Sequence, residues 1–398
     1  MPRKQKIAVV NSHPIQYFAP LYAYLSRSEQ IEVTAIYCSD ISLRGGTDPG
    51  FKREVKWDVD LLSGYRPVFL GARAKVRVPR GFFSLICPEV WREITTGEYD
   101  ALWIHGYAHA VNIIAVLAAK YKGIPVFVRS ETHLGLQRSG LKRLLRDRIL
   151  RVAYGFIDGF LSIGSGNRQY YESLGIESSR IFDVPYTVDN DRFIQSSKLS
   201  VFGRNSIRSK YGLDENLPVV VYASKFIPRK HPDDLVLAFS ALQQEGISAS
   251  LLLVGTGVME AELRQMVARL NLRNVVFAGF ANQSELPNIF GASDVFVLPS
   301  ENEPWGLIVN EAMCAGLPII VSKEVGCVQD LVEDGVNGCC ILAGDVGSLV
   351  TSLRTILGDE ERRKSMGERA RQRISQWSYE QCRIGVLRSL NLEIEGSR

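Results

Sequence analysis

The most informative run of residues in this sequence is Glu303-Pro-Trp-Gly306-Leu-Ile-Val-Asn-Glu311-Ala-Met-Cys-Ala-Gly316-Leu-Pro318. It follows the apolar run Val295–Leu298, which is typical of a buried strand, and its own pattern predicts a helix that begins just after Gly306. A strand, a glycine-containing turn and a helix start together favour an anion site, because free N–H groups and the positive end of the helix dipole point at the ligand. Glu303 precedes this helix and Glu311 lies within it, so the two carboxylates can hold different parts of one ligand.

The same alternation of short apolar runs and helical patterns extends along the whole chain. In the N-terminal half we expect strands at residues 7–10, 31–37, 101–104, 125–128, 159–162 and 181–186. In the C-terminal half we expect them at residues 219–222, 250–254, 275–277, 295–298 and 318–321. Strands that alternate with helices predict an α/β fold of parallel sheets with helices on both faces. Residues 40–95 show only mixed loops and short elements, and residues 190–205 are typical of a polar hinge.

Composition and charge narrow the class of protein. The 398 residues are 46% hydrophobic and 23% charged, which is ordinary for a globular chain and enough for two domains. A net charge of +4 is too small to indicate nucleic acid binding. The seven Cys include no Cys-x-x-Cys pair, which favours reduced thiols, and no apolar run approaches the roughly 20 residues that cross a bilayer. We therefore expect a cytoplasmic protein that binds no nucleic acid.

The Glu303–Pro318 stretch resembles the Glu-x7-Glu signature of retaining, nucleotide-sugar-dependent glycosyltransferases of the GT-B architecture, the family 4 type (glycosyl transferases group 1). Pro-Trp-Gly stands where that family more often has Ser-Phe-Gly or Gly-Phe-Gly. The resemblance covers nearly all of residues 215–345 and, more loosely, the N-terminal half. It implies two Rossmann-like, doubly wound domains facing a central cleft. They are an acceptor-side domain at residues 1–190 and a donor-nucleotide domain at 205–375, with residues 376–398 returning as a helix to the first domain.

In such enzymes this stretch binds the donor. The resemblance implies that Glu303 contacts sugar hydroxyls near the reacting carbon and that Glu311 accepts hydrogen bonds from the ribose. Backbone amides for the diphosphate would come from Gly306, Leu307 and Ile308. Gly279 and Phe280 end another strand on the same edge, where the matching loop of the family contacts the nucleotide base. The alternative for Phe280 is a place in the core.

A second segment, Val221-Tyr-Ala-Ser-Lys225-Phe-Ile-Pro-Arg-Lys230-His-Pro232, resembles the strand and loop whose two cations clamp the donor diphosphate in this family. Fixed cations stabilise the charge of a departing diphosphate more than they stabilise the ground state. Lys225 takes the usual place of an Arg and Lys230 that of a Lys, while His231 and Pro232 replace the common Gly. Lys and Arg are not equivalent, because Lys gives a point charge. Two solvated loop lysines are the alternative.

Polar residues gather after the N-terminal strands, at the edge where open parallel sheets bind ligands. His13 follows the first strand, His109 follows residues 101–104, and Glu131 and His133 follow residues 125–128. In the family a His of the first domain approaches the donor sugar. His133 or His109 could fill that place, and Glu131 could stand where the family keeps its His. Acceptor contacts are expected around His13 to Tyr17 and in residues 40–95, and satisfied surface groups are the alternative for each His.

Residues 141–154 alternate basic and apolar residues at helical spacing. Such a helix can lie on an anionic membrane surface, which would place the protein at the inner face of the membrane, or it can be a domain helix with a solvated face. No Asp-x-Asp loop or clustered His/Cys spacing indicates a metal, so we expect neither a metal nor another cofactor. Asp233 and Asp234 fit the first turn of a helix.

The resemblance predicts a retaining, hexosyltransferase-like enzyme. It would move a sugar from a nucleoside diphosphate sugar to a hydroxyl of a glycan or lipid-linked acceptor, in cell-surface polysaccharide or glycolipid biosynthesis. Two alternatives remain open at this point. One is a nucleoside diphosphate sugar epimerase of the same architecture, and the other is a protein that binds the nucleotide sugar without transfer.

Overall fold

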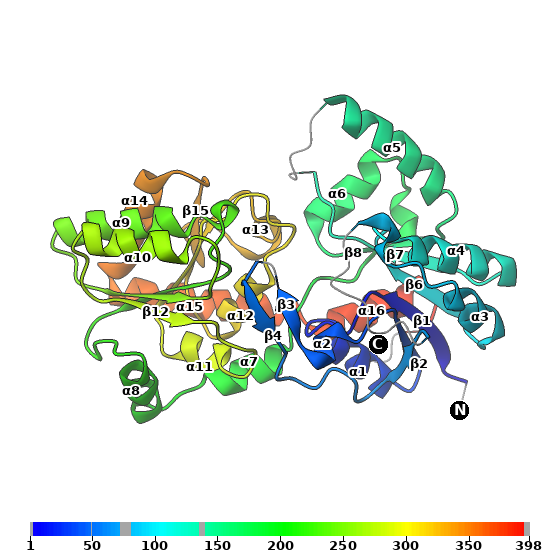
Figure 1. Cartoon of the computed structure of the whole chain (residues 1–398), viewed down its shortest axis with the longest axis horizontal. Coiled ribbons are helices and arrows are strands. Elements are labelled where there is room, and N and C mark those ends of the chain that lie inside the picture. Colours follow the sequence, from blue (N-terminus) through cyan, green and yellow to red (C-terminus); the bar gives the residue numbers. More distant parts are fainter. Residues whose placement is uncertain (1–2, 49, 72–80, 135–139, 394–398) are drawn as a thin grey trace. The chain divides into compact units, whose positions relative to one another are not determined.

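The computed structural model describes residues 3–48, 50–71, 81–134 and 140–393 (Figure 1). Its contacts divide the chain into two compact units. Unit 1 comprises Met1–Gly46, Glu54–Tyr186 and Ser378–Arg398, and unit 2 comprises Thr47–Arg53 and Thr187–Trp377. The short segment Thr47–Arg53 therefore groups with unit 2, although the stretches on both sides of it belong to unit 1.

Unit 1 contains a seven-stranded parallel sheet in the order β5-β2-β1-β6-β7-β8-β9. The strands are β1 (Gln5–Asn11), β2 (Ile31–Tyr37), β5 (Arg66–Phe69), β6 (Ala101–His105), β7 (Val126–Arg129), β8 (Gly159–Ser162) and β9 (Ile181–Asp183). The order of the strands reverses between β1 and β6. In open parallel sheets this switch point is where ligands bind, beyond the carboxyl ends of the strands.

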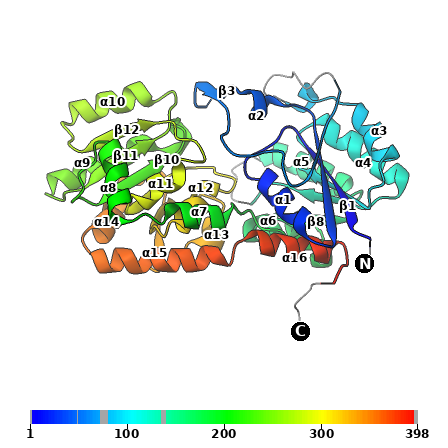
Figure 2. The same cartoon turned by 90° about the horizontal axis from the view of Figure 1, so that it is seen from below.

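The helices of unit 1 include one from the end of the chain. They are α1 (Ala19–Arg27), α2 (Ile41–Arg44), α3 (Glu89–Thr96), α4 (Ala110–Lys122), α5 (Gly140–Tyr154), α6 (Ser165–Ser173) and α16 (Tyr379–Ser389). Helix α16 packs against β8, β9 and α1 (Figure 2). Gly385 permits this close approach, because a Cβ there would lie 1.9 Å from the carbonyl oxygen of Asp183. The last helix of the chain thus packs against the sheet of the N-terminal unit.

Unit 2 contains a six-stranded parallel sheet in the order β12-β11-β10-β13-β14-β15. The strands are β10 (Val219–Ala223), β11 (Ser250–Val254), β12 (Val275–Gly279), β13 (Val295–Leu298), β14 (Ile319–Ser322) and β15 (Gly338–Ile341). Its switch point lies between β10 and β13. The prediction of two Rossmann-like α/β domains is therefore confirmed.

Helices cover both faces of the second sheet. On one face α9 (Pro232–Gln244) packs against α10 (Glu260–Arg269) and α14 (Val346–Leu357), and on the other α7 (Asn190–Ser197) packs against α11 (Leu286–Gly291) and α12 (Leu307–Cys314) (Figure 1). The unit also contains α8 (Val201–Lys210), α13 (Val328–Leu331) and α15 (Glu360–Ser375). Within the described ranges, no helix combines the length and the apolar composition that crossing a bilayer requires.

The expected hinge at residues 190–205 is wrong, because these residues form α7 and the start of α8. The side chains of Asp189 and Ser200 cap the two helices by accepting hydrogen bonds from backbone N–H groups. In α8, Arg204 and Arg208 lie 2.6 and 2.7 Å from the carboxylate of Asp294. The polar residues that suggested a hinge are therefore helix caps and ion-pair partners.

The region at residues 40–95 consists of loops and short elements, as expected. It holds α2, β3 (Gly46–Asp48), β4 (Arg53–Val55), β5, the short 3-10 helix Phe82–Ser84 and α3. Residues 72–80, where acceptor contacts were also expected, lie outside the described residues.

Candidate functional site

The loops after β10 and β13 meet at the switch point of the unit 2 sheet. The first loop carries Lys230 and the second carries Glu303, and the Lys230 ammonium forms an ion pair with the Glu303 carboxylate. Nη1 of Arg229 lies 3.3 Å from the same carboxylate oxygen. The fold therefore brings together two of the residues that the sequence analysis assigned to donor binding.

Lys230 is a buried cation, with 6% of its surface exposed. Burial lowers the pKa of Lys230, Glu303 opposes this effect, and the nearby charges of Arg229 and Lys225 lower the pKa further. The desolvation of a buried charge is costly unless partners of opposite charge and good geometry compensate for it. A multiply charged anion at this position would compensate more fully than one carboxylate does.

Gly306 sets the start of α12 beside this ion pair. Its φ is 94°, in the left-handed region, and a Cβ there would lie 2.8 Å from Cγ1 of Val325. The N–H of Gly326 donates to the carbonyl oxygen of Glu303 at 3.0 Å, which fixes the loop before the helix. Because the first turn of a helix leaves N–H groups without intrahelical partners, Leu307 and Ile308 present such groups at this end of α12.

The unusual Trp305 of the Pro-Trp-Gly run is accommodated inside unit 2. It is buried, and its indole N–H donates to Oδ1 of Asn310 at 3.0 Å. Its ring stacks on that of Trp377, with centroids 6.2 Å apart and planes 22° from parallel. Trp305 therefore packs behind the loop, and the glycine turn is formed despite the departure from the family pattern.

Glu311 lies inside unit 2 with none of its surface exposed. Its Oε1 accepts a hydrogen bond from Nε2 of Gln283 at 3.2 Å. Arg192 of α7 holds Gln283 in turn, since its guanidinium donates to the backbone oxygen and to Oε1 of Gln283 at 2.8 and 2.9 Å. Neither Gln283 nor Arg192 could be predicted from the sequence, because nothing in their local pattern marks them as partners of Glu311.

Lys225 has a different partner from Lys230. Both carboxylate oxygens of Asp48 lie near its Nζ, at 2.9 and 3.0 Å, and the ammonium lies 4.7 Å from the ring centroid of Phe51. Asp48 and Phe51 belong to the region where the sequence analysis expected acceptor contacts, but they group with unit 2. The two lysines thus pair with different carboxylates, Lys225 with Asp48 and Lys230 with Glu303.

The ends of β11 and β12 lie beside the end of β10 on the same edge of the sheet. A Cβ on Gly255 would lie 1.9 Å from the Ser224 carbonyl oxygen, so the glycine turn after β11 serves close packing on the loop after β10. Gly279 ends β12 with a φ of 73°. Phe280 follows it and is only partly buried, with its ring centroid 5.0 Å from that of Phe51. Phe280 is therefore a residue of the sheet edge rather than of the core.

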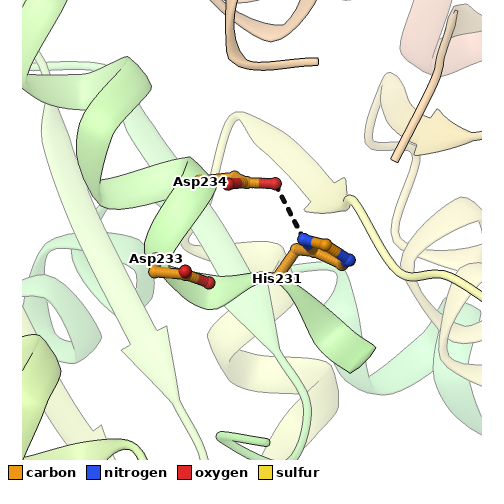
Figure 3. Close-up of side chains that lie close together, drawn as sticks. All are labelled: His231, Asp233 and Asp234. Carbon is orange, nitrogen blue, oxygen red and sulfur yellow. Dashed lines mark ion pairs between the residues drawn. The ribbon is translucent and has the colours of Figure 1, made fainter. Parts of the chain in front are cut away.

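A histidine and two carboxylates converge at the start of α9, a combination outside the Asp-x-Asp and His/Cys spacings considered in the sequence (Figure 3). Possible ligand atoms of His231, Asp233 and Asp234 all lie within 4.8 Å of one another, a donor set that can hold a divalent cation. Nδ1 of His231 lies 2.9 Å from Oδ2 of Asp234. His231 has a φ of 48° at the position where the family commonly has Gly, so this contact stabilises a left-handed backbone.

In unit 1, His13 and His109 follow the two strands that flank the switch point. Burial lowers the pKa of His13 to about 4, and the charge of His109 acts in the same direction. Nδ1 of His13 lies 2.9 Å from Oγ of Ser12, and Nδ1 of His109 lies 3.3 Å from the carbonyl oxygen of Gly81. Tyr17, just before α1, is partly buried.

Glu131 and His133 follow β7 on the same edge of the unit 1 sheet. The hydroxyl of Tyr186 donates to Oε1 of Glu131 at 2.7 Å, while His133 is partly buried. Next to them Arg129 is almost fully buried and donates to the carbonyl oxygens of Val184 and Pro185 at 2.9 and 2.7 Å. His13, His109, Glu131 and His133 thus all follow carboxyl ends of strands of this sheet.

Two family models match the chain. The model described as Glycosyl transferases group 1 matches residues 203–373, and the model described as Glycosyl transferase 4-like domain matches residues 14–187. Together they cover most of both units. The first includes Lys225, Lys230, Glu303 and Glu311.

The chain is similar in sequence to several curated proteins. N-acetyl-alpha-D-glucosaminyl L-malate synthase of Bacillus anthracis is 33% identical over 178 residues, which are 44% of this chain and 45% of that protein. GDP-mannose-dependent alpha-(1-6)-phosphatidylinositol monomannoside mannosyltransferase of Mycolicibacterium smegmatis is 26% identical over 77% of this chain and 83% of that protein. D-inositol 3-phosphate glycosyltransferase of Nocardia farcinica is 28% identical over 58% and 52%. The match spans about half the length of two of these three relatives.

Solved structures share the fold. Anabaena Alr3699/HepE in complex with UDP has a TM-score of 0.73 at 18% identity, covering 98% of this chain and 100% of that one. Sucrose-phosphate synthase from Thermosynechococcus elongatus has a TM-score of 0.71 at 20% identity, covering 96% and 97%. At these identities the likeness shows the fold alone. With the two family models it confirms the resemblance seen in the Glu303–Pro318 stretch, and the chain belongs to the glycosyltransferases of the GT-B architecture and family 4 type.

Proposed function

We propose that this chain transfers a sugar from a nucleoside diphosphate sugar to a hydroxyl acceptor with retention of anomeric configuration. One observation carries the proposal: a buried cation, Lys230, lies beside Glu303 at the switch point of a Rossmann-like sheet, next to the N-terminus of α12. Buried positive charge and free helix amides in one place suit a pyrophosphate. The epimerase and the pure binding protein are not favoured, because the curated relatives described above are named as transferases or as a synthase.

In this proposal each residue of unit 2 acts on a defined part of the donor. Lys230, Lys225 and the N–H groups of Leu307 and Ile308 stabilise the departing diphosphate, whose charge grows in the transition state. Glu303 holds the sugar hydroxyls near the reacting carbon. The ribose would lie against Glu311, and the base against Gly279 and Phe280.

The acceptor side and the mechanism follow the same logic. We infer that His13 and Tyr17 contact the acceptor, and that His109 or His133, beside Glu131, contacts the donor sugar. Retention would proceed by front-face attack, with the donor phosphate taking the proton of the acceptor hydroxyl. We further infer that no metal is needed, because the fixed cations of unit 2 supply the positive charge that a metal would bring to a diphosphate.

We also propose that unit 1 contacts an anionic membrane through α5, where a lipid-linked acceptor would be found. On and just after this helix an apolar row faces solvent, with Leu145, Ile149, Val152 and Phe156 exposed by 63, 60, 72 and 57%. The exposed side chains of Arg148 and Arg151 accompany that row. An apolar row accompanied by arginines suits an interface of acyl chains and anionic headgroups. Glycolipid or cell-surface glycan biosynthesis is the setting that this surface supports.

A thermal-shift series with UDP, GDP and ADP tests the donor site. We expect one nucleotide to raise the melting temperature by mass action. Lys230→Met should weaken its binding at least about tenfold, because a charge-assisted contact is lost. Lys364→Met, which removes an exposed cation paired with Glu360, should leave the shift unchanged.

The reaction is then checked with the matched nucleotide sugar and a set of glycan and lipid-linked hydroxyl acceptors. Release of nucleoside diphosphate that depends on an acceptor, with an unchanged anomeric configuration in the product by NMR, supports the proposal. No response to any of the three nucleotides, or conversion of the donor without an acceptor, would contradict it.

A further inference from the structure

The segment Thr47–Arg53 contacts the ends of three adjacent strands of the unit 2 sheet. Asp48 pairs with Lys225 after β10, the Phe51 carbonyl oxygen accepts from Oγ1 of Thr256 after β11 at 2.8 Å, and the Phe51 ring meets Phe280 after β12. The carboxyl ends of these strands form the edge where the proposed function places the nucleotide. A short piece of the chain thus lies on the donor-binding edge.

Asp48 presents an anion where a phosphate is expected. Its two carboxylate oxygens lie 2.9 and 3.0 Å from Nζ of Lys225. Oδ1 also accepts from the backbone N–H groups of Gly50 and Phe51, at 2.8 and 3.0 Å. Burial raises the pKa of Asp48, but the hydrogen bonds from Lys225 and from these amides outweigh it, so the pKa lies below its ordinary value. The carboxylate is therefore ionised at neutral pH and held toward the lysine.

Phe51 presents an aromatic ring where a base is expected. Its ring meets that of Phe280 edge to face, with centroids 5.0 Å apart and planes at 82°. The guanidinium of Arg53 lies 4.8 Å from the centroid of Phe280. Aromatic rings and an arginine that can stack are the groups that favour a nucleobase.

The segment packs closely against the side chain of Lys225. A Cβ built on Gly50 would lie 2.5 Å from Cδ and 3.0 Å from Nζ of Lys225, so the backbone at Gly50 touches the lysine stem. A phosphate bound to the same ammonium would meet the Asp48 carboxylate, and like charges at such short range repel. The segment and a diphosphate would therefore compete for Lys225.

We propose that Thr47–Arg53 is an internal competitor of the donor nucleotide, with the Asp48 carboxylate in place of a phosphate and the Phe51 ring in place of the base. This inference rests on the proposed function of unit 2. Donor binding displaces the segment from Lys225 and Phe280, so the apparent affinity is lowered by the fraction of molecules in which the segment is bound. The ammonium is kept paired until the donor arrives, which reduces the cost of leaving a half-buried cation without a counter-charge.

Titration calorimetry of wild type and variants with the matching nucleoside diphosphate tests the sign of this effect. Asp48→Asn keeps an oxygen for the turn and removes the charge, and Phe51→Ala removes the ring. Both should lower the dissociation constant, by about threefold or more. Asp60→Asn is the matched control, because Asp60 also accepts from the backbone N–H groups two and three residues ahead, Leu62 and Ser63, and has no lysine partner among the described residues.

Hydrogen exchange of the wild-type chain gives a second reading that needs no variant. Addition of the nucleotide should speed exchange at the amides of Gly50 and Phe51, because their acceptor, Asp48, leaves. A lid that closes over the donor would instead slow exchange, and Asp48→Asn and Phe51→Ala would then weaken binding. Slower exchange, or affinities equal to or weaker than wild type, overturns the inference. Failure of wild type and all variants to bind any nucleotide instead overturns the proposed function, and this inference with it.

Discussion

At Gly306 the backbone has a φ of 94°, and the space that a Cβ would take is already filled by Val325. Gly335 offers a comparison within the same unit, because its φ is 76° and a Cβ there would meet nothing within 4 Å. Both positions disfavour a side chain through the backbone, but only Gly306 adds a steric clash. The clash arises because the loop before α12 is held against residues 325–327 by backbone hydrogen bonds.

Gly306→Ala should therefore lower the free energy of unfolding by about 1–3 kcal/mol more than Gly335→Ala does. Chemical denaturation of the two variants beside wild type measures this difference. Gly306→Ala should also weaken nucleotide binding, since it displaces the first amides of α12. Equal destabilisation by the two substitutions would mean that the loop moves freely away from Val325.

His13 gives a pH dependence whose direction is set by burial. Burial lowers its pKa to about 4, whereas an unfolded chain titrates near 6.5. Between about pH 6.5 and pH 4, His13 is protonated in the unfolded state but stays neutral in the folded state. The free energy of unfolding therefore does not depend on His13 above about pH 6.5. It falls as the pH drops from about 6.5 to 4, with a slope of up to about 1.4 kcal/mol per pH unit.

His13→Gln should make the fall in unfolding free energy between pH 6.5 and 4.5 less steep. Denaturation curves at three pH values in this window provide the measurement. Some slope remains, because burial also lowers the pKa of His105. Parallel pH profiles for wild type and variant would show that His13 is not the group that burial keeps neutral.

At the scale of elements, α5 is the helix whose exposed face most needs an explanation. Ile149→Glu places a charge within its apolar row and should reduce co-sedimentation with vesicles that contain anionic phosphatidylglycerol, by about fivefold or more. Val201→Glu is the control, since Val201 on α8 is 78% exposed but belongs to unit 2. Binding to anionic vesicles that is equally strong for both variants and wild type, or that is no stronger than binding to neutral vesicles, would contradict the proposed membrane contact.

The elements with strong apolar patterns were the ones that could be predicted. The five C-terminal strands expected from the sequence are present as β10 to β14, because buried parallel strands are continuous apolar runs. Residues 190–205 misled the prediction because α7 and α8 carry polar side chains on both faces. Their arginines are satisfied by Asp294 and Gln283, which lie far away in the sequence. Local patterns contain no information about such partners.

At the scale of the whole molecule, the candidate site was predictable where one short motif carries it. Glu303, Gly306 and Glu311 lie within a single strand, turn and helix, and Lys230 follows a neighbouring strand. Asp48 could not be predicted as the partner of Lys225, because 177 residues separate them and Asp48 lies in a half of the chain that otherwise forms unit 1. Parallel-sheet topology predicts which edge binds a ligand, but not which distant loop lies on it.

The central claim is that a pyrophosphate binds between Lys230 and the N-terminus of α12. A crystal structure of the chain with its matching nucleoside diphosphate tests this most directly. We expect phosphate oxygens within hydrogen-bonding distance of Nζ of Lys230 and of the N–H groups of Leu307 and Ile308, with the Asp48 carboxylate withdrawn from Lys225. A nucleotide bound with its phosphates away from α12, and Lys230 still paired only with Glu303, would contradict the account.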